Sequence, residues 1–261
     1  MSINYNLDIL ISTFGSGVFN LENVILPFHP NVRYLVLHQA YKGFNLPQKL
    51  ACREDVQYIS SDAIGVTKSR NALLNSAKSD FVYFCDDDVL LKDNIYSTIT
   101  DAFKTLGADI ITFNVTNEYG ALRKNYPSKV TNRWWFNILS VGTIEIAAKK
   151  ESIKAVRFNE LMGAGSGIPI GDEAVFLSDC LRSHLKISHC PLVVTSHPTV
   201  SSGACSGRDY VYARGYTIRE VYGLFAGLIF LPVFFIARYK LFSDTFCGIK
   251  NLYAGFFKSR K

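Results

Sequence analysis

The chain has 261 residues, of which 48% are hydrophobic and 19% charged, so it can bury a sizeable core and is not a disordered protein. The formal net charge of +6 is unevenly placed: residues 218–261 hold seven Lys or Arg and two acids, a net charge of +5. The remainder is nearly neutral and shows no nucleic-acid-binding module, so an anionic partner is expected for the C-terminal segment alone.

Short apolar β-type runs alternate with helical patterns over the first 115 residues. The spacing predicts strands at 7–13, 33–38, 56–60, 81–85 and 109–115. It predicts helices at 66–77 and 94–107. Near-continuous apolar strands separated by helices are typical of a parallel sheet that is covered on both faces, with ligands bound at the carboxyl ends of its strands.

The pattern loosens after residue 115. Residues 117–137 are polar, aromatic and irregular, and strands are predicted at 141–148 and 191–197. Between these strands, a glycine-rich loop leads into an amphipathic helix over 158–187. We expect the "GAGSG" of this loop to close over bound ligands, because no strand–turn–helix unit surrounds it as a dinucleotide-binding fingerprint would require.

Three adjacent aspartates, Asp86, Asp87 and Asp88, directly follow the predicted strand 81–85. On an extended backbone, Asp86 and Asp88 would share one face while Asp87 points away. Two carboxylates at the rim of a sheet suit Mg²⁺ or Mn²⁺, which also takes substrate phosphates and water as ligands. The alternative is a solvated turn that caps the following helix.

The sequence around these aspartates follows an ordered set of motifs. A glycine–hydrophobic–x–x–x–Arg–Asn pattern precedes them and is formed by Gly65, Val66, Arg70 and Asn71. Together with Asp86, Asp88 and the opening "ILISTFG" at 9–15, this resembles the inverting family 2 of the GT-A glycosyltransferases. The later "GAGSGIPIGDEAVFL" at 163–177 is similar to the acceptor-side loop of that family, so the resemblance extends over roughly residues 7–200.

The resemblance implies the fold and the roles of individual residues. The fold would be α/β of the GT-A type, with a Rossmann-like, mainly parallel central sheet flanked by helices. The implied nucleotide-sugar-binding residues are Thr13, Asp62, Arg70, Asp86 and Asp87. The implied metal ligands are Asp88 and Asp86, with His197 as a further candidate, and the metal would be Mn²⁺ or Mg²⁺.

Sugar transfer also needs a base for the acceptor hydroxyl, and "GDEAVFL" supplies Asp172 and Glu173. The second acid of the family's Glu-Asp pair is the base, and this position corresponds to Glu173. Because the order here is Asp-Glu, Asp172 stays open as the base, or as a helix N-cap. A single base and a single displacement imply inversion at the sugar carbon.

The C-terminal segment combines an uncharged run, 221–237, with basic residues on both sides. The run is at the lower edge of membrane-spanning length and contains Pro232. We therefore expect it to lie in the interface or re-enter, with the basic residues on anionic headgroups; a core helix in an oligomer is the alternative. Scattered cysteines without C-x-x-C pairs favour a reducing compartment. Together with the nucleotide-sugar substrate that the resemblance implies, this leads us to expect the chain at the cytoplasmic face of a membrane.

Three parts follow from this reading: a nucleotide-sugar-binding half at 1–115, an acceptor-binding and catalytic half at 116–217, and a membrane-associating tail at 218–261. The predicted function is metal-dependent, inverting transfer of one sugar to a glycan or lipid-linked acceptor, in bacterial-type surface polysaccharide assembly. No Q-x-x-R-W follows the candidate base, which favours single transfers over polymerisation. The alternatives are a sugar-1-phosphate nucleotidyltransferase, whose glycine-rich phosphate loop is not seen, and an inactive membrane-tethered binding protein.

Overall fold

A computed structural model describes residues 6–199, 207–238 and 245–258. Its strands are β1 (Leu7–Phe14), β2 (Val32–Gln39), β3 (Val56–Ser61), β4 (Phe81–Asp86), β5 (Leu90–Leu91), β6 (Ile110–Thr116), β7 (Thr131–Asn132), β8 (Ile146–Lys149) and β9 (Ile187–Ser196). Its helices are η1 (Gly15–Asn20), α1 (Leu21–Val24), α2 (Gln48–Ala51), α3 (Val66–Ser76), α4 (Ile95–Leu106), η2 (Thr143–Glu145), α5 (Asp172–Arg182), α6 (Gly207–Ala237) and α7 (Thr245–Phe256).

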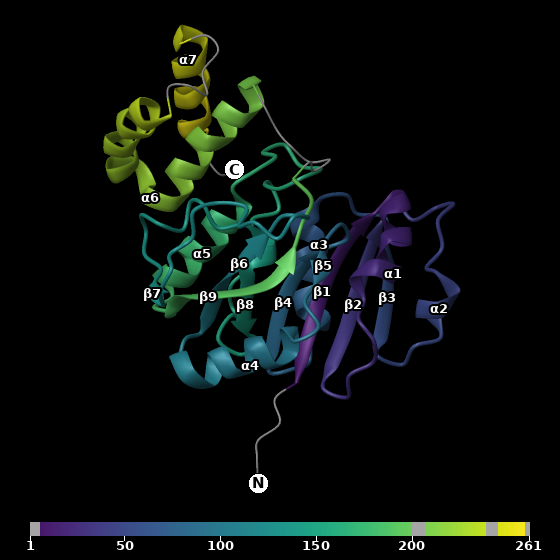
Figure 1. Cartoon of the computed structure of the whole chain (residues 1–261). Coiled ribbons are helices and arrows are strands. Elements are labelled where there is room, and N and C mark those ends of the chain that lie inside the picture. Colours follow the sequence, from purple (N-terminus) through teal and green to yellow (C-terminus); the bar gives the residue numbers. More distant parts are fainter. Residues whose placement is uncertain (1–5, 200–206, 239–244, 259–261) are drawn as a thin grey trace.

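The strands form one nine-stranded sheet in the order β3-β2-β1-β4-β8-β6-β9-β5, with β7 paired to β9. Strands β1 to β4 run parallel, as do β6 and β9, whereas the short strands β5, β7 and β8 are antiparallel to their neighbours. The predicted α/β fold with a mainly parallel sheet is therefore confirmed. The parallel strands end at the edge of the sheet that faces α6 (Figure 1).

Helices cover both faces of the sheet. Apolar side chains of α1, α2 and α4 form one buried cluster with residues such as Ile9 and Tyr83 from the strands. Side chains of α3 and α5 form a second cluster on the other face, around Leu10 and Phe84. Because neighbouring residues of a strand point to opposite faces, a strand buried on both sides is apolar nearly throughout, as β4 is.

Helix α6 consists of two helical parts that are separated at Gly223, where φ is 75° and ψ is −171°. The first part packs against the sheet domain and contributes Ala213 and Tyr216 to the cluster around α3 and α5. Helix α7 packs along α6 and buries Leu252 and Phe256 in a separate apolar cluster. The predicted boundary between 217 and 218 therefore falls inside a helix.

Two predicted strands differ from the structure. Residues 143–145 form the 3-10 turn η2, in which the backbone N–H of Glu145 donates to the carbonyl of Gly142 at 3.1 Å, and only 146–149 are extended. The last strand begins at Ile187, before the predicted start at 191. The sequence did not predict its first part, because Ser188 and His189 are polar although both are buried in the structure.

Asp8 fixes the start of the parallel sheet. Its carboxylate is fully buried and accepts hydrogen bonds from Arg33 at 2.8 and 2.9 Å, from the backbone N–H groups of Lys78 and Ser79, and from the Ser79 hydroxyl at 2.6 Å. The single side chain thus joins β1 to β2 and to the turn before β4. A buried charge is tolerated only when it is paired in this way.

Replacing Asp8 with alanine should lower the free energy of unfolding by about 3–5 kcal/mol, because the two buried N–H groups and Arg33 lose their common acceptor. Urea denaturation followed by circular dichroism measures this loss. The matched control is Asp101→Ala, which removes an exposed pair with Lys104 and should change the stability by less than about 1 kcal/mol. Equal effects of the two substitutions would contradict the role of Asp8.

Candidate active site

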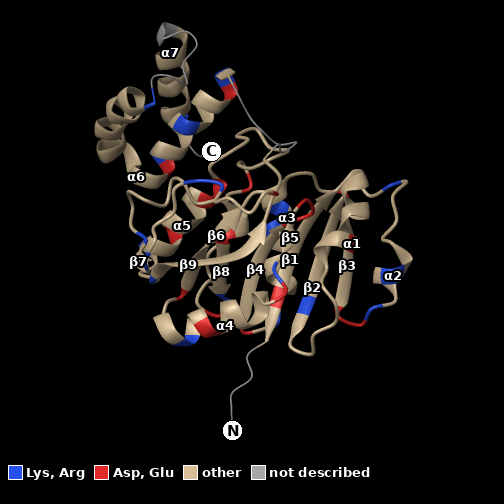
Figure 2. Cartoon of the chain, viewed as in Figure 1, with Lys and Arg blue, Asp and Glu red and all other residues tan. Residues whose placement is uncertain are grey.

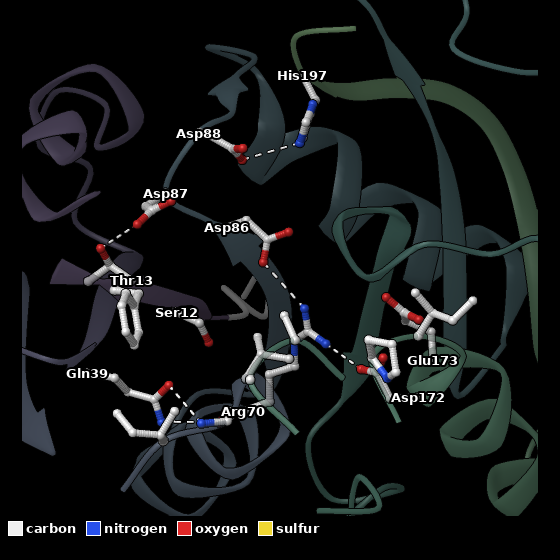
Figure 3. A pocket seen from close by; sticks show the side chains of 18 residues that line it. Ser12, Thr13, Gln39, Arg70, Asp86, Asp87, Asp88, Asp172, Glu173 and His197 are labelled. Atoms are coloured by element: carbon white, nitrogen blue, oxygen red, sulfur yellow. Dashed lines mark hydrogen bonds and ion pairs between the residues drawn. The ribbon is translucent and has the colours of Figure 1, made fainter. Parts of the chain in front are cut away.

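A cavity of about 600 Å³ opens at the carboxyl ends of β1, β2 and β4. Its wall combines Ser12 and Thr13 from β1, the three aspartates after β4, Arg70 from α3 and the start of α5 (Figure 3). The volume lies within the range of small-molecule sites, and the position matches the place where parallel α/β sheets bind ligands.

The three aspartates all line the cavity, but each has a different partner. Strand β4 ends at Asp86 and a turn follows, and the Asp87 side chain turns toward Thr13, away from the partners of Asp86 and Asp88, although all three carboxylates border one cavity (Figure 3). Asp87 accepts a hydrogen bond of 2.5 Å from the hydroxyl of Thr13. A side chain at Gly17 would collide with this carboxylate, since a Cβ there would lie 2.0 Å from Asp87 Oδ2.

Asp88 and His197 form a pair of potential metal ligands. His197 Nε2 lies 3.3 Å from Asp88 Oδ1, and both side chains border the cavity (Figure 3). The hydrogen bond from His197 lowers the pKa of Asp88, and the carboxylate in turn raises the pKa of His197. No group of three metal-ligating side chains occurs within the described ranges, so phosphate oxygens and water would have to complete the coordination of an ion held here.

Arg70 crosslinks the two predicted halves of the domain. Its guanidinium donates to Asp172 Oδ2 at 2.5 Å and to Asp86 Oδ1 at 3.4 Å, and the side chain is 7% exposed. Helix α3 is held in register with β1 by a hydrogen bond of 2.8 Å between Ser69 and Ser12. Arg70 therefore contacts carboxylates on both sides of the cavity.

Asp172 and Glu173 occupy the first turn of α5, where the helix dipole favours negative charge. The preceding residue, Gly171, has a left-handed φ of 90°, and a Cβ there would lie 2.1 Å from the hydroxyl of Thr217 in α6. Glu173 is half-buried and accepts a hydrogen bond of 2.5 Å from the hydroxyl of Thr143. The two acids thus point to different partners, Asp172 to Arg70 and Glu173 to Thr143.

Burial dominates the electrostatics of the cavity. Burial raises the pKa of Asp172 to about 7, and the neighbouring charge of Glu173 acts in the same direction. Burial also raises the pKa of Asp86, although Arg70 opposes the shift. Five carboxylates, those of residues 86–88, 172 and 173, thus line one cavity with Arg70 and His197 as the cationic or potentially cationic side chains. This surplus of negative charge suits a bound cation.

The glycine-rich loop lies against the start of α3. The carbonyl of Ala164 accepts a hydrogen bond of 2.9 Å from the backbone N–H of Val66, and the hydroxyl of Thr67 donates to the carbonyl of Met162 at 2.8 Å. Ala164, Gly165 and the following residues 169–170 form part of the cavity wall. The loop therefore closes one side of the site, next to Arg70.

Asp62 is the one predicted binding residue that does not border the cavity. Its side chain is 75% exposed and lies 3.4 Å from Lys42. Sequence reasoning missed three other residues: Gly17, Thr143 and Gln39, which braces the carbonyls of Ala63 and Gly65. Of these, Gln39 could have been found, because it ends β2 beside Phe14, the last residue of β1, at the ligand-binding edge of the sheet.

Residues 47–162 match the family model described as glycosyl transferase family 2. A comparison with curated protein sequences found no match.

Solved structures of S. aureus TarS share the fold. The structure of TarS 1–349 superposes with a TM-score of 0.63 at 12% identity, over 82% of this chain and 65% of that one. The complex of TarS 1–349 with UDP-GlcNAc superposes with a TM-score of 0.59 at 13% identity, over 82% of this chain and 66% of that one. The complex with UDP superposes with a TM-score of 0.62 at 15% identity, over 92% of this chain and 73% of that one. Full-length TarS superposes with a TM-score of 0.64 at 15% identity, and this chain spans only 44% of its length.

Arg70→Met should lower the free energy of unfolding by about 3–5 kcal/mol at pH 8, where Asp172 is ionised and would be left buried without its partner. Urea denaturation at pH 8 and pH 5 measures the effect. The loss should be smaller at pH 5, because Asp172 is then largely protonated in the folded state.

The matched control is Arg157→Met, which removes an exposed arginine that hydrogen-bonds Asn75. Its effect should stay below about 1 kcal/mol at both pH values. A loss for Arg70→Met that does not depend on pH would contradict the charge pairing with Asp172.

Proposed function

Residues 47–162 carry the sequence pattern of glycosyl transferase family 2, and from this premise we propose that the chain is a metal-dependent, inverting glycosyltransferase. It transfers a single sugar from a nucleotide-sugar donor to a glycan or lipid-linked acceptor, in bacterial-type surface polysaccharide assembly. The observation that carries the proposal is one cavity that combines an acidic turn after β4 with a half-buried carboxylate at the start of α5.

The donor diphosphate occupies the side of the cavity formed by the acidic turn. Asp88 and His197, together with Asp86, would hold Mn²⁺ or Mg²⁺, which the surplus negative charge of the cavity favours. The metal supplies positive charge that stabilises the leaving diphosphate. Because UDP and UDP-GlcNAc are bound in the TarS structures, UDP is the first nucleotide to test here.

Thr13, Asp87 and Arg70 organise the donor side of the site. Thr13 and Asp87 form a hydrogen-bonded pair that can offer oxygen atoms to a ribose or a phosphate-bound ion. Arg70 keeps its two carboxylate partners in place and is the buried cation nearest the acidic turn. Asp62 stays a prediction for contact with the nucleotide base, from outside the cavity wall.

Glu173 is the base. Asp172 is ion-paired with Arg70, whereas Glu173 borders the cavity, accepts a hydrogen bond from the neutral Thr143 hydroxyl and interacts with the neighbouring Asp172. The acceptor hydroxyl oxygen forms a bond to the anomeric carbon as its proton passes to Glu173. The bond between that carbon and the nucleoside diphosphate breaks, and attack from the opposite face inverts the configuration.

The apolar part of α6 associates with a membrane, on its cytoplasmic face, where nucleotide-sugars are available. Support comes from the length and composition of Gly207–Ala237, of which little of the apolar part is buried. The rival functions predict different ligands: a nucleotidyltransferase would prefer a nucleoside triphosphate, and an inactive binding protein would bind without turnover.

Glu173→Gln should lower kcat by about 10²–10⁴-fold, because the amide cannot accept the proton. The affinity for UDP should not change, since Glu173 lies away from the acidic turn. Turnover is measured by mass spectrometry with the sugar nucleotide that a donor screen identifies, and UDP binding by isothermal titration.

The matched variant is Asp172→Asn, which keeps an oxygen acceptor for Arg70 and should retain most of the turnover. Complete loss of turnover in Asp172→Asn with normal UDP binding and normal stability would make Asp172 the base. Full activity of Glu173→Gln would refute the assignment of Glu173.

A further inference from the structure

The second part of α6 exposes an apolar face. Phe225, Ile229 and Ile236 are 83%, 72% and 71% exposed, and the helix from Val221 to Ala237 carries no charged residue. In Figure 2 the ribbon of this second part of α6 is tan, the colour of residues other than Lys, Arg, Asp and Glu. Exposed apolar surface of this extent is typical of a membrane or protein contact.

The sheet domain adds an aromatic turn to this face. Trp134 and Phe136, in the connection between β7 and η2, are 59% and 74% exposed. Trp135 between them points inward, with the Arg182 guanidinium 5.3 Å from its ring centroid. The turn therefore presents its two outer aromatic side chains to solvent and anchors itself with the middle one.

Ring contacts hold the aromatic turn against α6. The rings of Phe136 and Phe230 stack with centroids 5.6 Å apart, and Phe230 stacks on Tyr222 at 4.1 Å. The Tyr222 hydroxyl also donates to the carbonyl of Trp135 at 2.7 Å. These contacts hold the turn to α6 on both sides of Gly223 and place Phe136 next to the second part of α6.

The charge of the C-terminal segment favours a lipid bilayer over a second copy of the chain. The sequence after Ala237 contains six Lys or Arg and one acid, a net charge of +5. Two of these basic residues, Lys250 and Lys258, lie in or just after α7, which packs along α6, so a symmetric dimer formed through α6 would be opposed by like charges. An apolar helix followed by a basic segment matches the acyl chains and anionic headgroups of a membrane.

We propose that Trp134 and Phe136 insert into the interface of an anionic bilayer together with the second part of α6. The membrane then contacts the sheet domain itself, not only the C-terminal helix. This inference rests on the membrane association and the base proposed above.

The aromatic turn links the bilayer to the acceptor side of the active site. From the turn the chain passes through the buried residues Ile138 and Val141 to Thr143, whose hydroxyl is hydrogen-bonded to Glu173. The base thus lies at the end of a short segment that starts in the membrane interface. This arrangement suits an acceptor whose lipid part stays in the bilayer while its hydroxyl reaches Glu173.

The two tryptophans of the chain, Trp134 and Trp135, make the proposal directly testable by fluorescence. The full chain with Trp135→Phe reports on Trp134, and Trp134→Phe reports on Trp135. With phosphatidylcholine–phosphatidylglycerol vesicles that carry brominated acyl chains, the fluorescence of Trp134 should be quenched more strongly than that of Trp135. Vesicle binding without quenching of Trp134 would overturn the proposal and leave α6 as the sole contact.

Co-sedimentation with unbrominated vesicles of the same composition tests the energetics. Phe136→Ser should reduce the partition coefficient by about tenfold, the change expected when roughly 1.4 kcal/mol of apolar burial is lost. The control Phe28→Ser removes an equally exposed phenylalanine, 68% exposed, from the loop before β2 and should not alter binding.

Three outcomes would refute the inference. Equal binding of the Phe136→Ser and Phe28→Ser variants would exclude the aromatic turn, while membrane association through α6 would stand. No binding of the unaltered chain would remove both claims, without bearing on UDP binding or turnover. A dimer in vesicle-free ultracentrifugation that Phe136→Ser dissociates would assign the surface to a second copy.

Discussion

The buried guanidinium of Arg70 is the constraint on which the rest of the site depends. It lies between Asp86, at the end of β4, and Asp172, at the start of α5, and pairs with both. Without a cation at this point, the carboxylates of the two segments would face each other in a poorly solvated cavity, and their repulsion would force the segments apart or protonate them. The same arrangement leaves the acidic turn with more negative than positive charge. A divalent cation held at the acidic turn, as proposed above, would offset part of this surplus.

Much of this architecture follows from local sequence patterns. The apolar runs predicted β1 to β4 and β6 to within one or two residues, because most of these strands are buried on both faces and are therefore rich in hydrophobic residues. The start of β9 was not predicted, because its polar residues find their hydrogen-bond partners only in the folded chain. His189 is hydrogen-bonded to Thr112 and Arg133, which lie far from it in the sequence. The strand predicted over 141–148 was half wrong for a similar reason, since the 3-10 turn there is fixed by contacts of Glu145 with Lys124.

The candidate site was likewise predictable only in part from the sequence. The types of residue at the acidic turn and at 172–173 indicated their chemistry, but their pairings depend on backbone geometry. The turn after Asp86 directs Asp87 to Thr13 and Asp88 to His197, which an extended strand would not allow. The preference for Glu173 over Asp172 likewise rests on Arg70, 102 residues away from Asp172. Helix α6 connects these residues to the apolar surface, since it packs on Gly171 at one point and its carbonyls at 220 and 221 accept hydrogen bonds from Arg182 of α5.

The central claim is that the acidic turn binds a nucleoside diphosphate through a divalent ion, and titration calorimetry tests it most directly. UDP is titrated into the full chain in the presence of Mn²⁺, after removal of metal with EDTA, and with the Asp88→Asn variant. The account predicts binding of UDP with Mn²⁺ and a loss of affinity of at least about tenfold in the other two cases, equal to about 1.4 kcal/mol. Equal affinity with and without the metal, or a clear preference for UTP over UDP, would contradict it.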